Sequence, residues 1–157
     1  MRRMWCAALA LLLAGCGVRP AGVTGTGRAP TGLTPGVTLY FVDPHQRLQP
    51  QLRATGRLGT IAEALALLLT GPGDTDLHTE ITSNGVTRVG VDTPQGLIRL
   101  VVPLASYEVT PLGIDQLVCT ALGVWVQGGG SRTTRVQVSF TLRTPESNKR
   151  RVCPLIS

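Results

Sequence analysis

The alternation of two hydrophobic periodicities along residues 37–142 constrains this fold more than any other sequence feature. Two hairpins are predicted, one over 86–102 with its turn at 92–96 and one over 124–142 with its turn at 128–130. A further strand is expected at 37–42, and two helix-like segments separate these strand regions. Hairpins mixed with helices predict an α+β fold class, as a single compact domain with a mostly antiparallel sheet and two helices on one face.

Both predicted helices carry a recognisable start signal. Thr60 is followed three residues later by Glu63, which is the spacing of a capping box. Thr110 precedes Pro111, which is typical of an N-cap followed by proline at the first helical position. The second helix is expected to end before Gly123, because glycine commonly terminates a helix.

The N-terminal residues differ in composition from the rest of the chain. Arg2 and Arg3 precede an apolar run over 4–14 that is too short to span a bilayer, a pattern typical of a secretory signal peptide. The run ends in Leu13-Ala14-Gly15-Cys16, which resembles a bacterial lipobox. This resemblance implies that 1–15 is a lipoprotein signal peptide and that Cys16 is the lipidation site, carrying acyl chains such as palmitate. The alternative is an ordinary buried cysteine in an N-terminal helix.

A lipid on Cys16 implies a cell-membrane protein that is lipid-anchored on the extracytoplasmic side. Residues 16–35 are then the lipidated cysteine plus a flexible Gly/Pro/Thr linker, and 36–157 are the folded domain. Cys6 falls in the leader, so Cys119 and Cys153 remain as a predicted disulfide that tethers the C-terminal tail. Two free thiols in a redox or metal site are the open alternative.

The formal net charge of +6 does not predict a nucleic-acid partner. Basic residues concentrate in the leader, the linker and the tail, whereas residues 37–145 contain eight basic and eight acidic side chains. Aromatic residues make up only 4% of the chain, which leaves few rings on which bases could stack. The basic tail is interpreted as a solvated end close to an anionic membrane.

No combination of residues points to a reaction. The nucleophile-elbow and phosphate-loop motifs are missing from the sequence, so we expect no enzyme activity, no catalytic residue and no cofactor. Three carboxylates and one imidazole gather within seven residues, at Asp74, Asp76, His78 and Glu80. Acidic residues in loops more often form turns and caps, and the spacing fits no common metal motif, so no metal site is expected.

One basic segment is a candidate interaction surface. Arg47, Arg53 and Arg57 surround two glutamines and could bind an anionic partner. The alternative is a solvated edge whose charges prevent aggregation between strands. Pro50 lies in the same segment, which is therefore predicted to be an extended edge or a loop.

Several short motifs resemble the GerMN domain, which is named from sporulation and spore germination proteins. They are Tyr40-Phe41-Val42, Arg47-Leu48, Arg53, Gly71-Pro72 and the run from Gln116 to Thr120. The resemblance covers residues 37–142 and implies a fold similar to ring-building domains of secretion and sporulation assemblies. It also implies an interaction module of a bacterial lipoprotein, of the kind found in actinobacteria, with no catalytic residues to carry over.

These features together predict a membrane-anchored extracytoplasmic lipoprotein that serves as a non-enzymatic protein-interaction or adaptor module of the cell envelope. Its expected partners are the membrane, through the lipid anchor, and another envelope protein or a second copy of itself, bound through a sheet edge or a helix face. The alternative is a lipoprotein that binds a small solute or a cell-wall fragment. That alternative needs a concave pocket with a few polar groups.

Overall fold

The computed structural model describes residues 36–156. The predicted signal peptide 1–15, the lipidation site Cys16 and the linker 16–35 lie outside the described residues. The helices and strands are β1 (Val37–Val42), β2 (Leu48–Arg53), α1 (Ile61–Leu69), β3 (Gly90–Asp92), β4 (Leu97–Val101), α2 (Pro111–Gln127), β5 (Arg135–Ser139) and β6 (Arg150–Arg151). Two short 3₁₀ turns, η1 (Ser106–Glu108) and η2 (Pro145–Asn148), complete the order.

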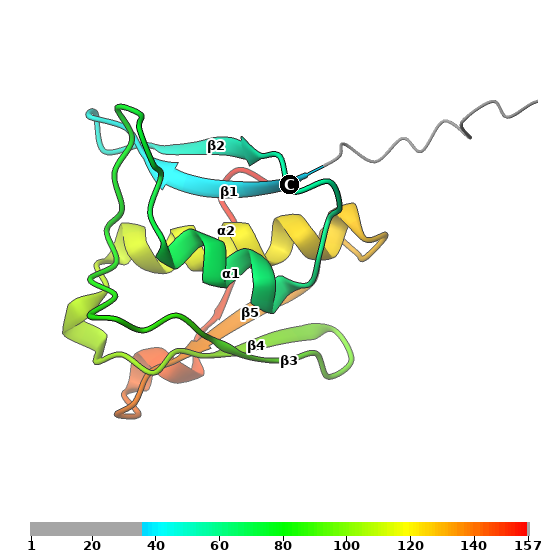
Figure 1. The fold of residues 1–157 in the computed structure, drawn as a ribbon. Coiled ribbons are helices and arrows are strands. Elements are labelled where there is room, and N and C mark those ends of the chain that lie inside the picture. The colour runs from blue at the N-terminus through cyan, green and yellow to red at the C-terminus, as the bar shows by residue number, and fades with distance from the viewer. Residues whose placement is uncertain (1–35, 157) are drawn as a thin grey trace, which may run out of the picture. The chain divides into compact units, whose positions relative to one another are not determined.

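The strands form two sheets with the helices between them (Figure 1). β1 and β2 make an antiparallel pair, and the second sheet has the order β3-β4-β5-β6. All pairings are antiparallel except that of β4 with β5. The predicted α+β class with mostly antiparallel strands is confirmed. We expected one sheet with both helices on one face. Instead the helices pack between two sheets, since α2 contacts both β1 and β5.

The predicted hairpin over 124–142 is wrong. Helix α2 continues through Gly123 to Gln127, and β5 begins only at Arg135. Gly123 does not end the helix, because it lies where α2 approaches the ring of Tyr40, and a Cβ there would sit 3.5 Å from the Cε2 atom of that ring. A helix of this length is a crossover connection, which brings β5 beside β4 in the parallel direction.

The other strand predictions hold in outline. β3 and β4 form the expected hairpin, although the paired part of the first strand is only Gly90–Asp92. The segment around Pro50 is extended and forms β2, which pairs on one side with β1. Proline cannot donate a backbone hydrogen bond, so it suits a strand at the edge of a sheet.

The capping box that begins α1 is confirmed. The Thr60 hydroxyl accepts a hydrogen bond from the Glu63 amide at 3.2 Å, and the Glu63 carboxylate accepts one from the Thr60 amide at 2.7 Å. The helix buries one face against β1 and α2, through Ile61, Ala64, Leu65 and Leu68. These side chains join a single core with the inward residues of both sheets.

Helix α2 also completes the hydrogen bonding of β1. The side chain of Gln116 is fully buried and donates from Nε2 to the Tyr40 carbonyl at 2.9 Å, while its Oε1 accepts from the Glu80 amide at 2.8 Å. The hydroxyl of Thr120 accepts from the Tyr40 amide at 3.2 Å. At Tyr40 the helix therefore occupies the place of a neighbouring strand, and the open edge of β1 is closed there.

Candidate functional site

The three arginines proposed as an interaction surface are not brought together by the structure. Arg47 lies before β2 and Arg53 ends it, so they stand at opposite ends of that strand. Arg47 pairs with Asp43 at 3.0 Å, and Arg53 donates to the Gly71 carbonyl at 3.2 Å. Arg57 pairs with a carboxylate at the start of α1. Each guanidinium thus has a local structural partner.

The carboxylate paired with Arg57 is that of Glu63. The two terminal nitrogens of the Arg57 guanidinium donate to it, at 2.5 Å from Nη2 to Oε1 and at 3.3 Å from Nη1 to Oε2. This hydrogen bond, together with that from the Thr60 backbone, lowers the pKa of Glu63 to about 2. The same carboxylate closes the capping box, so its ionised form supports the start of the helix.

The four clustered polar residues from Asp74 to Glu80 do not converge. Asp74 and Asp76 are exposed in a turn, while His78 contacts Glu80 at 3.1 Å. Within residues 36–156 no group of three or more His, Cys, Asp or Glu side chains is placed to hold a metal ion.

Asp43 organises the turn between β1 and β2. Its carboxylate accepts hydrogen bonds from the backbone amides of His45 and Arg47 and from the side chains of Arg47 and Gln49. Burial raises the pKa of this carboxyl, but the four hydrogen bonds outweigh burial and bring the pKa to about 2. Asp43 is thus a structural anion, and His45 beside it is exposed.

Cys119 and Cys153 lie at disulfide distance, as the cysteine count predicts. Their sulfurs are 2.02 Å apart, and the bridge spans a sequence separation of 34 residues. Both residues are buried. The bridge joins the middle of α2 to the C-terminal tail and so fixes Pro154 and Leu155 beside the helix.

That tail helps to form a groove with a volume of about 620 Å³. Its walls come from β1, β2, α2 and the tail: Tyr40, Arg47, Leu48, Gln49, Pro50, Leu112, Asp115, Pro154 and Leu155. Two large apolar side chains stand exposed on β2 and the tail, since Leu52 is 54% and Leu155 is 51% accessible. We call this surface the hairpin groove.

The sequence of β2 explains the hairpin groove. Side chains alternate between the two faces of a strand, and Leu48, Pro50 and Leu52 share the face that also presents Tyr40. Tyr40 and Leu48 on this face are buried with the core, whereas Pro50 and Leu52 further along β2 are exposed. The groove was not predicted from the sequence, although the alternation of apolar residues along β2 is a signal that indicates it.

The hairpin groove holds one partly buried acid. Burial raises the pKa of Asp115, and the nearby positive charge of Arg151 opposes that shift. The Gln49 amide nitrogen and the Arg47 guanidinium in the groove donate hydrogen bonds to the Asp43 carboxylate. The groove therefore offers a partner mainly apolar contact with one carboxyl group at its side.

A second groove lies beside α1. It has a volume of about 430 Å³, and its lining is Val37, Thr55, Arg57, Leu58, Gly59, Glu63, Ala64, Ala66, Leu67, Thr70 and Thr87. Its floor is apolar, and the ion pair of Arg57 with Glu63 stands in its wall. We call this surface the helix groove.

Comparisons with known proteins gave no relatives for this chain. No family model matches it, and neither the curated proteins nor the solved structures include a match. Within residues 36–156 no helix is both long and apolar enough to cross a bilayer.

Proposed function

We propose that this protein is a membrane-anchored extracytoplasmic lipoprotein whose domain acts as a non-enzymatic adaptor of the cell envelope. The lipobox-like sequence at Cys16 supports the anchor, and the resemblance to GerMN domains supports an interaction role. The observation that carries the adaptor proposal is the hairpin groove, with exposed Leu52 and Leu155 at its side. Exposed apolar patches that flank a groove are typical of protein-binding surfaces.

The proposed partner is another envelope protein or a second copy of this chain, bound through the face of the β1-β2 pair. The edge of β1 is a poor docking place, because Gln116 and Thr120 already hold the backbone of Tyr40. An apolar face with few free polar groups suits a partner that contributes apolar side chains of its own.

A site-specific cross-linking experiment in intact cells tests this proposal. A photoreactive residue replaces Leu155, which lines the hairpin groove, or Leu52, which lies beside it on β2. In a matched control it replaces the exposed Thr93 in the β3-β4 loop. We expect one and the same partner from both groove positions and none from Thr93. The cross-link should disappear when the other groove leucine is changed to glutamate.

A Cys16→Ser chain serves as the untethered control in the same cells. After the membranes are washed in 0.5 M salt, which removes charge-dependent binding, its loss from the membrane fraction would agree with the lipid anchor, and retention there would contradict it. Recovery of the protein as an uncross-linked monomer from both groove positions would contradict the adaptor proposal.

The helix groove favours a second candidate function, the binding of a small solute or a cell-wall fragment. Its volume lies within the range of small-molecule sites, and it combines apolar walls with a charged pair. A thermal-shift screen with soluble peptidoglycan fragments tests this candidate. A stabilisation that is lost in Arg57→Gln and kept in Arg47→Gln would favour it, whereas no shift with any fragment would count against it.

A further inference from the structure

Charge is distributed unevenly over this fold. Residues 36–80, which form β1, β2 and α1, contain five acidic and three basic residues. Residues 81–156, which form α2 and the four-stranded sheet, contain four acidic and eight basic residues. The excess of positive charge thus lies on the part of the chain that builds the four-stranded sheet.

Three of these cations share the outer face of that sheet. Arg99 on β4 is in register with Gln137 on β5, and Gln137 is in register with Arg150 on β6. Neighbouring strands are about 4.8 Å apart, so the backbones of Arg99 and Arg150 are separated by roughly 10 Å. Arg135 lies two residues before Gln137 and therefore on the same face.

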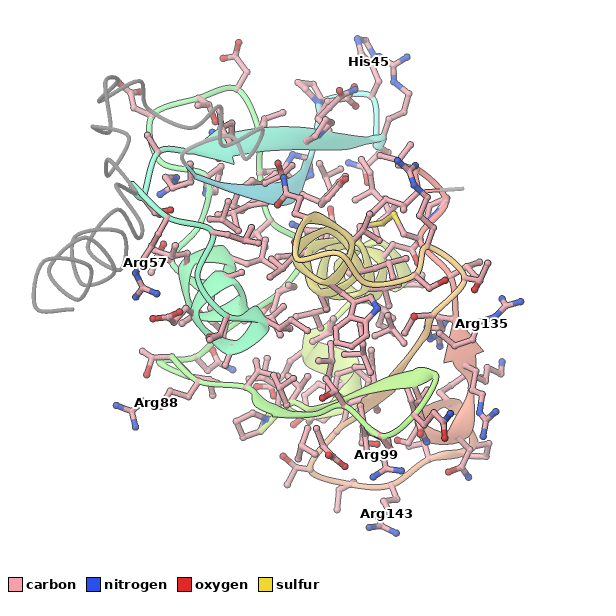
Figure 2. The ribbon with its side chains drawn as sticks, turned by 90° about the vertical axis from the view of Figure 1, so that its right-hand side faces the viewer. His45, Arg57, Arg88, Arg99, Arg135 and Arg143 are labelled. Atoms are coloured by element: carbon pink, nitrogen blue, oxygen red, sulfur yellow. A yellow bond between two sulfur atoms is a disulfide. The ribbon has the colours of Figure 1, made fainter. Side chains whose placement is uncertain are left out.

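The turn η2 contacts this face at Gln137, whose Nε2 donates to the Ser147 carbonyl at 2.7 Å, but Arg99, Arg135 and Arg150 around it are exposed. The alternate residues of β4 and β5 point inward and are fully or almost fully buried: Ile98, Leu100, Val136 and Val138. Both helices lie on that inner side of the sheet (Figure 1). In Figure 2 the side chains of Arg99, Arg135 and Arg143 extend away from the body of the domain. We call the surface formed by Arg99, Arg135, Gln137 and Arg150 the arginine face.

Most of this positive charge has no partner within the described residues. The side chains of Arg135 and Arg150 make no hydrogen bond or ion pair with residues 36–156. Arg99 contacts Asp92 at 3.0 Å, but both groups are exposed, and such pairs contribute little to stability. Structural pairing in the fold therefore does not account for the arginine face.

Exposed apolar side chains lie at one end of the arginine face. Val101 shares the face of Arg99 and is 52% accessible. The chain segments that continue from that end of β4 and β5 are joined by a hydrogen bond from the Thr141 amide to the Leu104 carbonyl at 2.9 Å. On these segments Leu142 is 69% and Tyr107 is 87% accessible.

We infer that the arginine face is a docking surface for an anionic phospholipid bilayer. Guanidinium groups bind phosphate oxygens in a bidentate manner, and basic residues near an anionic bilayer are attracted by its surface potential. Aliphatic side chains are favoured at the interface between headgroups and acyl chains, which suits Val101 on the face and Leu142 just beyond the end of β5. Charge complementarity thus selects the ligand, and the apolar residues select a bilayer over a soluble polyanion.

This inference deepens the proposed function, because it gives the anchored domain an orientation. The hairpin groove is formed by β1, β2, α2 and the tail, whereas the arginine face lies on the outside of the other sheet (Figure 1). A domain that rests on the bilayer by the arginine face presents the hairpin groove away from the membrane, where a partner can reach it.

Vesicle co-sedimentation tests the inference. The chain from Gly17 to Ser157, which keeps every described residue but cannot be lipidated at Cys16, is mixed with vesicles of phosphatidylcholine alone or with 30 mol % phosphatidylglycerol. We expect binding only to the anionic vesicles, and loss of binding in 0.5 M salt.

The variant R99Q/R135Q/R150Q should bind about 100-fold more weakly, since each basic residue near an anionic surface contributes roughly a fivefold factor. The matched control R19Q/R28Q/R88Q removes the same charge outside the arginine face and should bind like the unchanged chain. Near-UV circular dichroism confirms that each variant is folded. The variant V101S/L142S should also bind more weakly while its charge is unchanged.

Three results would overturn the inference. They are equal binding to both vesicle types, an equal loss of binding in the two triple variants, and binding of soluble polyphosphate without binding of vesicles. Because this chain lacks Cys16, such a failure would not contradict the lipid anchor or the hairpin groove, which are tested separately by the experiments in intact cells.

Discussion

Gln116 is predicted to contribute more to the free energy of unfolding than any exposed polar residue of this domain. The change Gln116→Met keeps the length of the side chain but removes both hydrogen bonds, at 2.9 Å to the Tyr40 carbonyl and at 2.8 Å from the Glu80 amide. Each buried group left without a partner costs about 1–3 kcal/mol, so the expected loss is about 2–6 kcal/mol. A domain of this size has a total stability of about 5–15 kcal/mol.

Equilibrium unfolding in urea measures this loss. Trp125 is the single tryptophan of the chain from Gly17 onward and reports unfolding by its fluorescence. With a slope of about 1–3 kcal/mol per molar urea, the midpoint of Gln116→Met should fall by roughly 1 M or more. Gln95→Met makes the same chemical change in an exposed loop and should alter the free energy of unfolding by less than about 0.5 kcal/mol.

A second substitution separates the two hydrogen bonds to Tyr40. Thr120→Val removes only the acceptor for the Tyr40 amide and should cost about 1–3 kcal/mol. The double variant with Gln116→Met should lose less than the sum, because both side chains hold the same backbone unit. If Gln116→Met changed the free energy of unfolding by less than about 0.5 kcal/mol, the argument that α2 replaces a strand beside β1 would be refuted.

Three further predictions concern stability. Replacing Cys119 and Cys153 together by alanine should cost about 3–4 kcal/mol, since the bridge closes a loop of 34 residues, and the same urea titration without reductant checks it. The pKa of Asp43 is about 2 in the folded state, below its usual value, so stability should be highest above pH 4 and fall between about pH 4 and pH 2; Asp43→Asn should flatten this part of the profile. Gly130→Ala should lower the melting temperature, because the added methyl would lie 2.2 Å from the indole nitrogen of Trp125, and an unchanged melting temperature would contradict that packing.

The start of each helix could be predicted from sequence, but the end of α2 could not. Caps are local signals: the hydroxyls of Thr60 and Thr110 bond amides three residues later in the chain. Gly123 has the same local appearance as a helix terminator, yet its role is set by Tyr40, a residue far away in sequence. A glycine that permits close packing cannot be distinguished from one that ends a helix until the packing partner is known.

The wrong end of α2 also produced the wrong strand pairing. A helix that stops before Gly123 leaves Val124 and its neighbours free to be interpreted as a strand, and the glycines after them as a hairpin turn. The longer helix makes the connection a crossover, and the parallel pairing of β4 and β5 follows from it. The long-range contact of Gly123 with Tyr40 therefore explains why the pairing of β4 with β5 was not predicted from the sequence.

Surface sites were harder to predict than the disulfide. Counting cysteines was enough to predict the pair Cys119–Cys153, because only these two remained once Cys6 and Cys16 were assigned to a predicted leader and a predicted lipobox. The arginines of 47–57 looked like a cluster in sequence, but each has a separate partner in the fold. Arg99, Arg135 and Arg150 are distant in sequence and become neighbours only through the register of three strands.

The parallel pairing of β4 with β5 also determines when the sheet can be completed as the chain is synthesised from its N-terminus. The hairpins β1-β2 and β3-β4 can form across the short loops 43–47 and 93–96. Strand β4 can pair with β5 only after all of α2, which separates the two strands in the sequence, has been synthesised. β6 bonds only to β5, and Cys153 follows β6, so the sheet edge and the disulfide are completed last. A chain that ends before Arg135 would contain both hairpins but would leave the backbone groups on one edge of β4 unpaired. We expect such a truncated chain to be more sensitive to proteases and to associate with other chains through this edge.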